Sequence, residues 1–377
     1  MKIIHIITGL SIGGAEQALY NLLKGGLAER FDNCVISLRD KGPMGLKISL
    51  LGVPVIALNM HAKKLPLAGL VKLIRIIREF SPDLIQGWMY HGNLIGSFSR
   101  VVAPGKPALV WNVRHSLSDL SQEKIATRQV IRINRWFSFG ADVILYNSHR
   151  SREQHEVFGF SKVGAKVIPN GIDTHIFSFS SKDRKHIRSK LGIPENACVV
   201  GHMARLHPMK DHAIFIQAAK SLSYRYQNLY FLLSGRDVSF DNIMLSQLLS
   251  SQVRHRFYFL GERNDVHKLM SAIDIFCLSS AWGEGFPNVL GEAMATSIPC
   301  VATDIGDSAL VVNKTGIIVP PCDVNALEEG IESLLTISSE DRISLGKIAL
   351  ERVEINYKLS KIVEKYASLY NELAKIS

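Results

Sequence analysis

The sequence predicts an α/β protein with two doubly wound domains, each built on a parallel sheet. Short apolar runs alternate with amphipathic segments along the first half of the chain, and the alternation starts again near residue 198. Such alternation is typical of parallel sheets with helices on both faces. Between the two runs, residues 167–173 read Val-Ile-Pro-Asn-Gly-Ile-Asp, and their Pro, Asn and Gly interrupt regular structure. The predicted domains are therefore residues 1–172 and 173–357.

The expected strands follow the apolar runs in order. In the first half they cover residues 2–8, 33–39, 54–60, 84–89, 108–114 and 143–148. In the second half they cover residues 198–204, 229–234, 256–260, 274–280, 298–303 and 316–319. A last amphipathic segment predicts a helix at about residues 358–376. Because ligands bind beyond the carboxyl ends of the strands in such sheets, two facing domains are expected to enclose one cleft.

Composition indicates a chain without a membrane span. The 377 residues are 47% hydrophobic, which is enough for two buried cores, but the apolar runs fall short of the ~18 residues that cross a bilayer. Residues 1–8 resemble a first strand more than a signal peptide. The five cysteines are widely spaced and form no Cys-x-x-Cys pair, which favours reduced thiols and gives no zinc signature. We therefore expect a cytoplasmic protein.

The net charge of +10 is confined to the first half of the chain. Residues 1–175 contain 22 Lys and Arg against 12 Asp and Glu, whereas the remainder contains 22 of each sign. This asymmetry indicates an anionic partner for the first half, which could be a membrane surface, a lipid diphosphate or a nucleic acid.

A basic amphipathic helix is expected at residues 124–137. Four cations share one arc of this helix, and the apolar residues occupy the other side; the cations are Lys124, Arg128, Arg132 and Arg135, and the apolar residues are Ile125, Ala126, Val130, Ile133, Trp136 and Phe137. Such a helix suits an anionic membrane surface. The alternative is a helix packed on the sheet with a solvated basic face. The charge asymmetry favours the membrane.

An anion site is expected at residues 283–295, which read Gly-Glu-Gly-Phe-Pro-Asn-Val-Leu-Gly-Glu-Ala-Met-Ala after a buried strand. Pro287 fits the first turn of a helix because its missing N–H would have no partner there. The helix dipole and the first N–H groups favour a phosphate; these groups belong to Asn288, Val289 and Leu290. Glu284 and Glu292 flank this place. Carboxylates that accept hydrogen bonds from hydroxyls suit a phosphate that carries sugars.

Two cations follow the first strand of the second half. Arg205 and Lys210 are five residues apart, and a planar guanidinium and a mobile ammonium can converge on one dianion. The alternative is a loop with ordinary surface charges. The sequence contains no Asp-x-Asp string and no cluster of Asp, His and Cys, so no metal is expected.

The first half offers a glycine loop and two histidines. Gly13 and Gly14 follow the first strand, where paired glycines let a ligand approach the backbone closely. Their spacing from Gly9 does not fit a dinucleotide-binding Gly-x-Gly-x-x-Gly string. His91 and His115 each follow a later strand. A lone histidine is more often structural than catalytic, but this position favours a role in a site.

These motifs resemble the retaining glycosyltransferases of family 4, which have the GT-B architecture of two Rossmann-like domains. The strongest matches lie between residues 167 and 295: the two-glutamate segment, the Val-Ile-Pro-Asn-Gly-Ile-Asp hinge, the Arg-Leu-x-x-x-Lys string and the Phe-Leu-Gly-x-Arg-x-Asp-Val string at 259–266. Asp211 departs from the glycine that usually follows the lysine. The resemblance implies that the last helix, residues 358–377, packs back on the N-terminal domain.

The resemblance implies a role for each matched residue. Glu284 would hold hydroxyls of the donor sugar and Glu292 the ribose, whereas Arg205 and Lys210 would stabilise the leaving diphosphate. His115, favoured over His91, would lie beside the transferred sugar. The remaining donor-binding residues would be Gly13, Gly14, Ser234, Gly235, Arg263, Asp265, Phe286, Pro287, Asn288, Val289 and Leu290. For Asp265 a helix N-cap is an equally good interpretation.

The resemblance therefore implies a retaining hexosyl- or N-acetylhexosaminyltransferase that uses a nucleotide-sugar, with UDP favoured, and no metal or cofactor is expected. The expected acceptor is a glycan or an undecaprenyl-type lipid-linked glycan in surface polysaccharide synthesis, reached in the cytoplasm or at the inner face of the membrane. A nucleotide-sugar epimerase could share the architecture but is expected to lack the two-glutamate segment. A nucleic-acid-binding protein should carry aromatic platforms or a known binding motif, and neither is found. The donor sugar, the acceptor and the linkage stay open.

Overall fold

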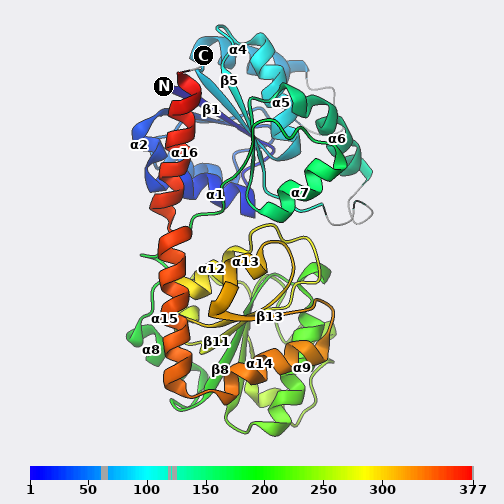
Figure 1. Cartoon of the computed structure of the whole chain (residues 1–377), viewed down its shortest axis with the longest axis vertical. Helices are drawn as coiled ribbons and strands as arrows, with labels where there is room; N and C mark the ends of the chain where they lie inside the picture. Colours follow the sequence, from blue (N-terminus) through cyan, green and yellow to red (C-terminus); the bar gives the residue numbers. More distant parts are fainter. Residues whose placement is uncertain (61–66, 118–119, 121–124, 376–377) are drawn as a thin grey trace. The chain divides into compact units, whose positions relative to one another are not determined.

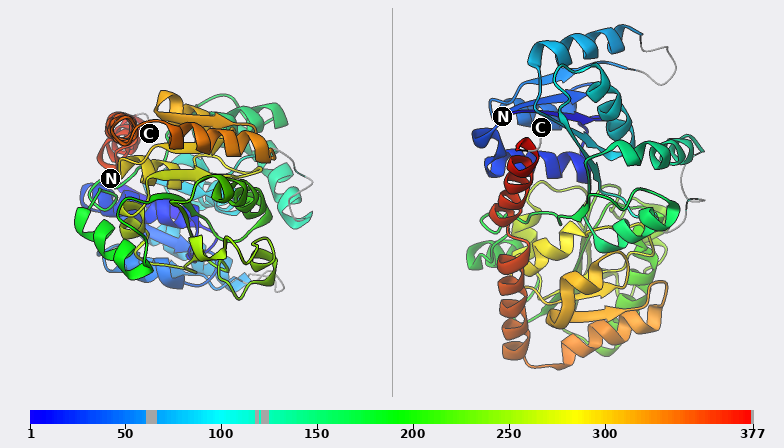
Figure 2. Two further views of the ribbon diagram at one scale, coloured as in Figure 1. Left: turned by 90° about the horizontal axis from the view of Figure 1, so that it is seen from below. Right: turned by 45° about the horizontal axis from the view of Figure 1, so that its top comes forward.

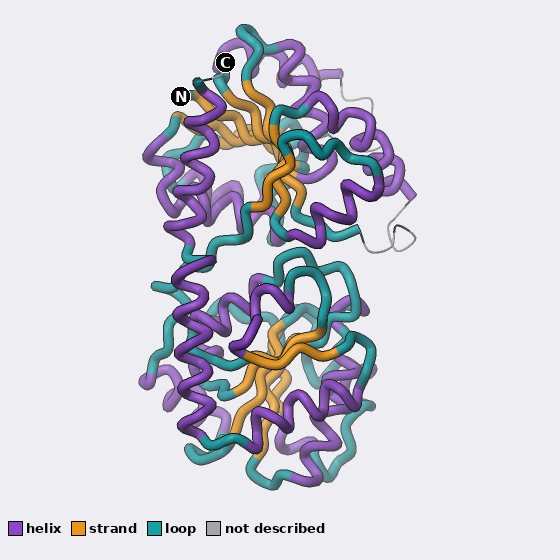
Figure 3. Tube along the Cα trace, in the orientation of Figure 1, coloured by secondary structure: helices purple, strands orange, loops and turns teal. Residues whose placement is uncertain are grey.

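The chain folds into two compact α/β units. A computed structural model describes residues 1–60, 67–117, 120 and 125–375 (Figure 1). The first unit comprises Met1–Gly171 and Leu359–Ser377, and the second comprises Ile172–Lys358. These bounds lie one residue from the predicted domain limits. In each unit the strands form a central layer and the helices cover both faces (Figure 2, Figure 3).

Within the described residues, the first unit contains a seven-stranded sheet in the order β3-β2-β1-β4-β5-β6-β7, in which every strand pair is parallel. The strands are β1 (Lys2–Ile7), β2 (Asp32–Ser37), β3 (Val55–Ala57), β4 (Leu84–Trp88), β5 (Ala108–Val113), β6 (Val143–Tyr146) and β7 (Ala165–Val167). Six of them were predicted. The edge strand β7 was missed because its three residues, Ala-Lys-Val, form no apolar run.

Helices of the first unit cover the two faces of this sheet. They are α1 (Gly14–Leu22), α2 (Ala28–Arg30), α3 (Gly42–Ser49), α4 (Leu67–Phe80), α5 (Met89–Val102), α6 (Ile125–Phe137), α7 (His149–Phe158) and α16 (Leu359–Ala374), with a π-helical turn η1 (Leu23–Leu27) and a 3₁₀ turn η3 (Ser138–Gly140). Successive side chains of a strand point to opposite faces of a sheet. Ile3 and Ile7 of β1 accordingly lie in one hydrophobic cluster with α1 and α16, whereas Ile4 and Ile6 lie in another with α4 and α5.

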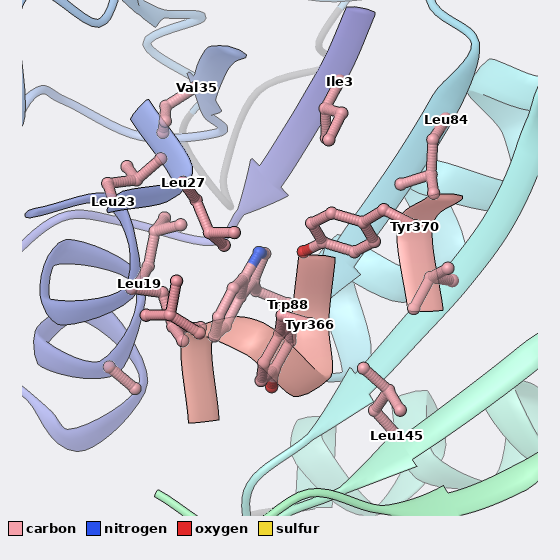
Figure 4. Close-up of a cluster of buried hydrophobic side chains, with 14 of the residues drawn as sticks. Ile3, Leu19, Leu23, Leu27, Val35, Leu84, Trp88, Leu145, Tyr366 and Tyr370 are labelled. Atoms are coloured by element: carbon pink, nitrogen blue, oxygen red, sulfur yellow. The ribbon is translucent and has the colours of Figure 1, made fainter. Parts of the chain in front are cut away.

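The C-terminal helix α16 belongs to the first unit and packs beside η1 and α1. Its Tyr366 and Tyr370 lie in the same buried cluster as Trp88 (Figure 4). Each tyrosine hydroxyl has a polar partner: Asn112 Nδ2 donates to Tyr366 Oη at 2.9 Å, and Tyr370 Oη donates to Gln86. A buried hydroxyl without such a partner would destabilise the folded chain, so these hydrogen bonds allow both tyrosines to be buried.

The second unit repeats the architecture. Among its residues, all of which are described, six parallel strands have the order β10-β9-β8-β11-β12-β13. The strands are β8 (Cys198–Met203), β9 (Leu229–Ser234), β10 (Phe257–Phe259), β11 (Ile275–Leu278), β12 (Cys300–Thr303) and β13 (Gly316–Val319). All six were predicted, and together with the first sheet they confirm the doubly wound fold class.

Two groups of helices cover the second sheet. The helices are α8 (Ser181–Leu191), α9 (His212–Arg225), α10 (Ile243–Ser246), α11 (Val266–Ser271), α12 (Asn288–Ala295), α13 (Ser308–Val312), α14 (Val324–Thr336) and α15 (Ser339–Asn356), with 3₁₀ turns η4 (Pro208–Lys210), η5 (Arg254–Arg256) and η6 (Asn313–Thr315). Residues of α8, α11, α12 and α15 form one hydrophobic cluster, and residues of α9, α10 and α14 form the other.

Each sheet has a topological switch point, where strand order reverses and ligands bind in folds of this type. In the first unit it lies between β1 and β4, and in the second between β8 and β11. The loops that follow these strands therefore position the candidate site residues.

Candidate functional site

Lys210 and Glu284 meet at the switch point of the second unit. Lys210 follows β8 and Glu284 follows β11, and these two strands are hydrogen-bonded neighbours. The ammonium of Lys210 forms an ion pair with the carboxylate of Glu284, and the two side chains are only 17% and 10% exposed. Ser280 Oγ donates a hydrogen bond of 2.6 Å to the same carboxylate oxygen. The predicted phosphate-binding cation and the predicted sugar-binding carboxylate are therefore in direct contact.

Two glycines allow the Glu284 loop to pack closely against the segments that follow β8 and β12. Gly283 has φ +78°, and a Cβ on this residue would collide with Sδ of Met209 in the loop after β8. Gly306, after β12, has φ +61°, and a Cβ there would collide with the carbonyl oxygens of Glu284 and Gly285. The left-handed φ favours glycine at both positions, and at Gly306 the close approach of backbone atoms requires it as well. The sequence motif included Gly283 but gave no sign that Gly306 borders it.

Ser279 ties the loop that carries Lys210 to β11. Its Oγ donates to the carbonyl oxygens of Lys210 at 2.9 Å and Asp211 at 3.1 Å. Because this hydroxyl proton is used, the buried His202 must donate from Nε2 to Ser279 Oγ, at 3.0 Å. Burial, and the nearby His212 and Lys210, hold the pKa of His202 well below its ordinary value, so this histidine is neutral. Neither Ser279 nor His202 was predicted.

The conformation of Asp211 explains why an aspartate can stand where the family usually has a glycine. Its φ of 45° and ψ of 56° lie in the left-handed region, which favours glycine but tolerates Asp and Asn. The Asp211 carboxylate also caps α9 by accepting a hydrogen bond of 3.3 Å from the N–H of Ile214. An N-cap stabilises a helix by about 1 kcal/mol. The aspartate therefore offsets its backbone strain with a cap.

The start of α12 differs from the prediction. Pro287 occupies the N-cap position, and the helix begins at Asn288. The N–H of Leu290 was expected to face a ligand, but this is wrong, because it donates to the carbonyl of Pro287 at 3.1 Å. The side chains of Phe286 and Leu290 are buried in the core, where the Phe286 ring packs 5.2 Å from that of Tyr357. Both side chains are structural.

Glu292 lies on α12, one turn after the start of the helix. Its side chain is half-buried among protein atoms, and this desolvation raises the pKa of its carboxyl to about 7. No hydrogen bond or ion pair reaches this carboxylate from the described part of the chain. A carboxyl group with free acceptor positions can bind hydroxyls of a ligand.

The turns after β9 and β10 are joined to each other. Ser234 Oγ and the N–H of Gly235 both donate to the carbonyl of Gly261, at 2.8 and 2.9 Å. Arg263 binds Asp265 through two hydrogen bonds of 2.7 Å. The N-cap interpretation of Asp265 is wrong for its side chain, which makes no capping bond to α11. The Arg263 guanidinium instead holds the Asp265 pKa below its ordinary value.

Arg205 lies on the exposed part of the loop after β8. The next residue anchors this loop, because the N–H of Leu206 donates to the carbonyl of Arg236 at 2.8 Å. The structure thus places Arg205 and Lys210 on one loop, five residues apart, with Lys210 held and Arg205 reaching solvent.

Gly13 and Gly14 precede and begin α1 after β1. A Cβ on Gly13 would meet the carboxylate of Glu16, which folds back over the start of the helix, whereas a Cβ on Gly14 would meet nothing within 4 Å. Burial raises the pKa of Glu16 above its ordinary value. The open surface at Gly14 is compatible with the predicted close approach of a ligand.

The two candidate histidines have different surroundings. His91 is exposed in the first turn of α5, directly after the switch-point strand β4. His115 is half-buried after β5, where Tyr90 packs edge-on against its ring at 6.3 Å. Ser151 Oγ donates to the His115 carbonyl at 2.5 Å, and Gln154 Oε1 accepts from the N–H of Leu117 at 2.8 Å. Helix α7 thus fixes the backbone on both sides of this loop.

Two structural features are absent from the described residues. They contain no group of three or more His, Cys, Asp or Glu side chains that could hold a metal ion. They also contain no helix that is long and apolar enough to cross a membrane.

Two family models match the chain. The model described as Glycosyl transferases group 1 matches residues 183–352, and the model described as Glycosyltransferase Family 4 matches residues 12–176. A curated relative is the UDP-Gal:alpha-D-GlcNAc-diphosphoundecaprenol alpha-1,3-galactosyltransferase of Escherichia coli. It is 23% identical over 391 residues, which cover 99% of this chain and 97% of the relative.

Solved structures show the same architecture. Anabaena HepE in complex with UDP superposes with a TM-score of 0.85 at 24% identity, over 99% of this chain and 100% of HepE. HepE in complex with UDP-glucose gives a TM-score of 0.83 at 23% identity, over the same shares of the two chains. With two doubly wound units in this chain, this similarity shows the GT-B fold.

Proposed function

The chain belongs to glycosyltransferase family 4, the glycosyl transferases group 1, and on this basis we propose that it is a retaining enzyme that uses a UDP-sugar. It transfers a hexosyl or N-acetylhexosaminyl group to a glycan or to an undecaprenyl-type lipid-linked glycan.

The contact between Lys210 and Glu284 carries this proposal. A donor has a diphosphate and a sugar joined by one glycosyl–phosphate bond, so its two recognition groups must lie close together. Lys210 supplies a cation for the diphosphate, and Glu284 supplies acceptors for the sugar hydroxyls at ion-pair distance from it. A donor that separates this pair gives each partner a new one, so neither is left buried and unpaired.

Cleavage of the glycosyl–phosphate bond moves negative charge onto the departing diphosphate. Arg205, Lys210 and the first N–H groups of α12, those of Asn288 and Val289, stabilise that charge. One well-placed donor lowers such a barrier by about 3 kcal/mol. We propose that these groups do this without a metal ion, and that activity therefore persists in EDTA.

Glu284 is proposed to bind the sugar and not to act as a nucleophile. Its Oε1 accepts a hydrogen bond from Ser280 Oγ, which lowers the reactivity of that oxygen and does not depend on Lys210. The acceptor hydroxyl is then proposed to attack from the side of the leaving diphosphate. His115 keeps its proposed place beside the transferred sugar, and Glu292 binds the ribose hydroxyls.

The UDP donor and the lipid-linked acceptor are proposed from what is known of similar proteins. The printed name of the Escherichia coli relative contains both UDP-Gal and a diphosphoundecaprenol acceptor, and HepE has been solved with UDP and with UDP-glucose. We therefore propose that the enzyme works in the cytoplasm, at the inner face of the membrane.

The test is a matrix of donors and acceptors. The enzyme is incubated with UDP- and GDP-linked hexoses and N-acetylhexosamines, with short glycans or synthetic polyprenyl-diphosphate sugars, in the presence of EDTA. Release of UDP and an α-linked product from an α-linked donor, assigned by NMR, are expected. Inversion at the anomeric carbon, turnover of GDP-sugars alone, or a strict need for Mn²⁺ would each contradict the matching part of the proposal.

A further inference from the structure

The first unit exposes a cluster of aromatic side chains at the end of α6. Trp136, Phe137 and Phe139 are 73%, 56% and 69% exposed, and Ile133, one turn earlier, is 46% exposed. The sequence placed Ile133, Trp136 and Phe137 opposite the cations, where packing on the sheet would bury them. The structure instead buries Ile131 and Asn134 of this helix. The exposed surface is therefore apolar as well as basic. Lys124 of the predicted helix lies outside the described residues.

Exposed cations accompany these aromatic side chains along the described part of the segment. Residues 125–140 contain three arginines and no Asp or Glu. Arg132 and Arg135 are exposed, and the Arg135 guanidinium lies 5.5 Å from the centre of the Trp136 ring. The nearby carboxylate of Asp142 is already bound, since it pairs with Arg100 at 3.2 Å and accepts from the N–H of Leu109.

The loop after α7 extends the surface. The N–H of Ser161 donates to Ser138 Oγ at 2.9 Å, and this bond fixes the loop beside η3. The two following residues are an exposed lysine and an exposed valine, Lys162 and Val163. Figure 1 shows α6 and α7 in the same region of the first unit. We define the aromatic–basic surface as Arg132, Ile133, Arg135, Trp136, Phe137, Phe139, Lys162 and Val163.

We propose that the aromatic–basic surface inserts into an anionic lipid bilayer. Aromatic side chains, tryptophan above all, favour the boundary between head groups and acyl chains. Each nearby Lys or Arg adds about 1 kcal/mol of attraction to an anionic leaflet. A second copy of the chain would bring like charges together on this surface, which opposes pairing. The inference deepens the proposed lipid-linked acceptor and takes its biological sense from it, but membrane binding is measured without transfer.

Vesicle binding tests the insertion. The full chain is co-sedimented with vesicles of phosphatidylcholine alone and of phosphatidylcholine with phosphatidylglycerol. We expect preference for the anionic vesicles, and a loss of about 100-fold in partition coefficient when Trp136, Phe137 and Phe139 are all changed to Ser. Ile243→Ser with Met244→Ser is the matched control, since these apolar side chains are 69% and 59% exposed on the second unit.

Quenching by brominated lipids separates insertion from surface attraction. Trp88 and Trp111 are buried, and Trp282 belongs to the second unit, so quenching should come from Trp136. Trp136→Phe keeps an apolar ring, so it should retain most vesicle binding but lose the quenching.

Three results would overturn the inference: equal binding of the triple variant, equal quenching in Trp136→Phe, or a concentration-dependent dimer that the triple variant loses while vesicles are not bound. Vesicle binding without transfer to any lipid-linked acceptor would instead contradict the proposed function alone.

Discussion

Ser280 and Lys210 bind the same oxygen of Glu284, one from each side of the second sheet's switch point. Ser280 belongs to the Glu284 loop, whereas Lys210 comes from the loop after β8. The shared oxygen therefore fixes the carboxylate relative to both loops. When a donor draws Lys210 to its diphosphate, the Ser280 bond still orients the Glu284 carboxylate.

Removal of the cations should slow transfer. Arg205→Ala and Lys210→Met are each expected to reduce kcat by about 100-fold, the loss expected for one charge partner of a leaving group. Steady-state transfer with a UDP-sugar measures this. Lys185→Ala, an exposed lysine of α8, is the control and should keep full activity. Near-normal turnover in either variant would remove that residue from the mechanism.

Ser280→Ala should lower kcat by about tenfold, because a hydrogen bond to a charged group contributes about 1.5–3 kcal/mol. Affinity for UDP should stay unchanged, since Ser280 contacts the carboxylate assigned to the sugar. Transfer kinetics and calorimetry with UDP measure the two quantities. Ser333→Ala removes an exposed hydroxyl that donates only to its own helix, and it serves as the control. Weaker UDP binding in Ser280→Ala would place Glu284 at the nucleotide.

The two glutamates should respond differently to loss of charge. Glu284→Gln is expected to reduce turnover far more than UDP affinity, whereas Glu292→Gln should weaken UDP by about tenfold through its ribose contacts. Calorimetry with UDP, paired with transfer rates, distinguishes the two effects. The opposite pattern would exchange the proposed sugar and ribose ends.

The fold could be read from the sequence because its strands are buried on both faces and so appear as apolar runs. Twelve strands were predicted in this way. The short edge strand β7 was not, since Ala-Lys-Val has neither length nor hydrophobic pattern. Helix α6 shows a second limit of sequence patterns. Periodicity separates its polar and apolar sides but cannot tell which side is covered.

The site was predictable where a local motif exists and not where contacts are distant in sequence. Lys210 and Glu284 came from two strings, but nothing in the sequence indicated that they touch. Gly306 follows Glu284 by 22 residues and borders it only because β12 lies beside β11. For Asp265 a local capping rule failed because Arg263, two residues earlier, competes for the carboxylate.

Gly306→Ala should displace the Glu284 loop. Both Gly306 and Gly192 have left-handed φ values, +61° and +68°, but a Cβ on Gly192 would meet nothing within 4 Å. Each alanine costs about 1 kcal/mol of stability from its backbone. Only Gly306→Ala should also lower kcat, by at least about tenfold, because small displacements of a catalytic group cost large factors in rate. Thermal unfolding and transfer rates test this, and equal activity of the two variants would show that the loop tolerates the added methyl group.

Glu292 should make stability depend on pH near neutrality. Burial raises the pKa of this carboxyl from its ordinary 4.5 to about 7 in the folded chain. The folded state therefore binds this proton more tightly than the unfolded state does. The contribution of the protonated carboxyl to the free energy of unfolding is complete below pH 4.5 and is lost as the pH rises through 7. Glu292→Gln removes the titration and should be more stable than the wild type at pH 8 by on the order of 1–3 kcal/mol. At pH 4.5 the difference should be close to zero.

Urea unfolding of both proteins at the two pH values measures the change; a difference that is the same at both would mean that Glu292 titrates normally. A ligand that binds the ionised carboxylate through hydroxyls should lower this pKa, and saturating UDP should therefore shift the loss of wild-type stability to lower pH.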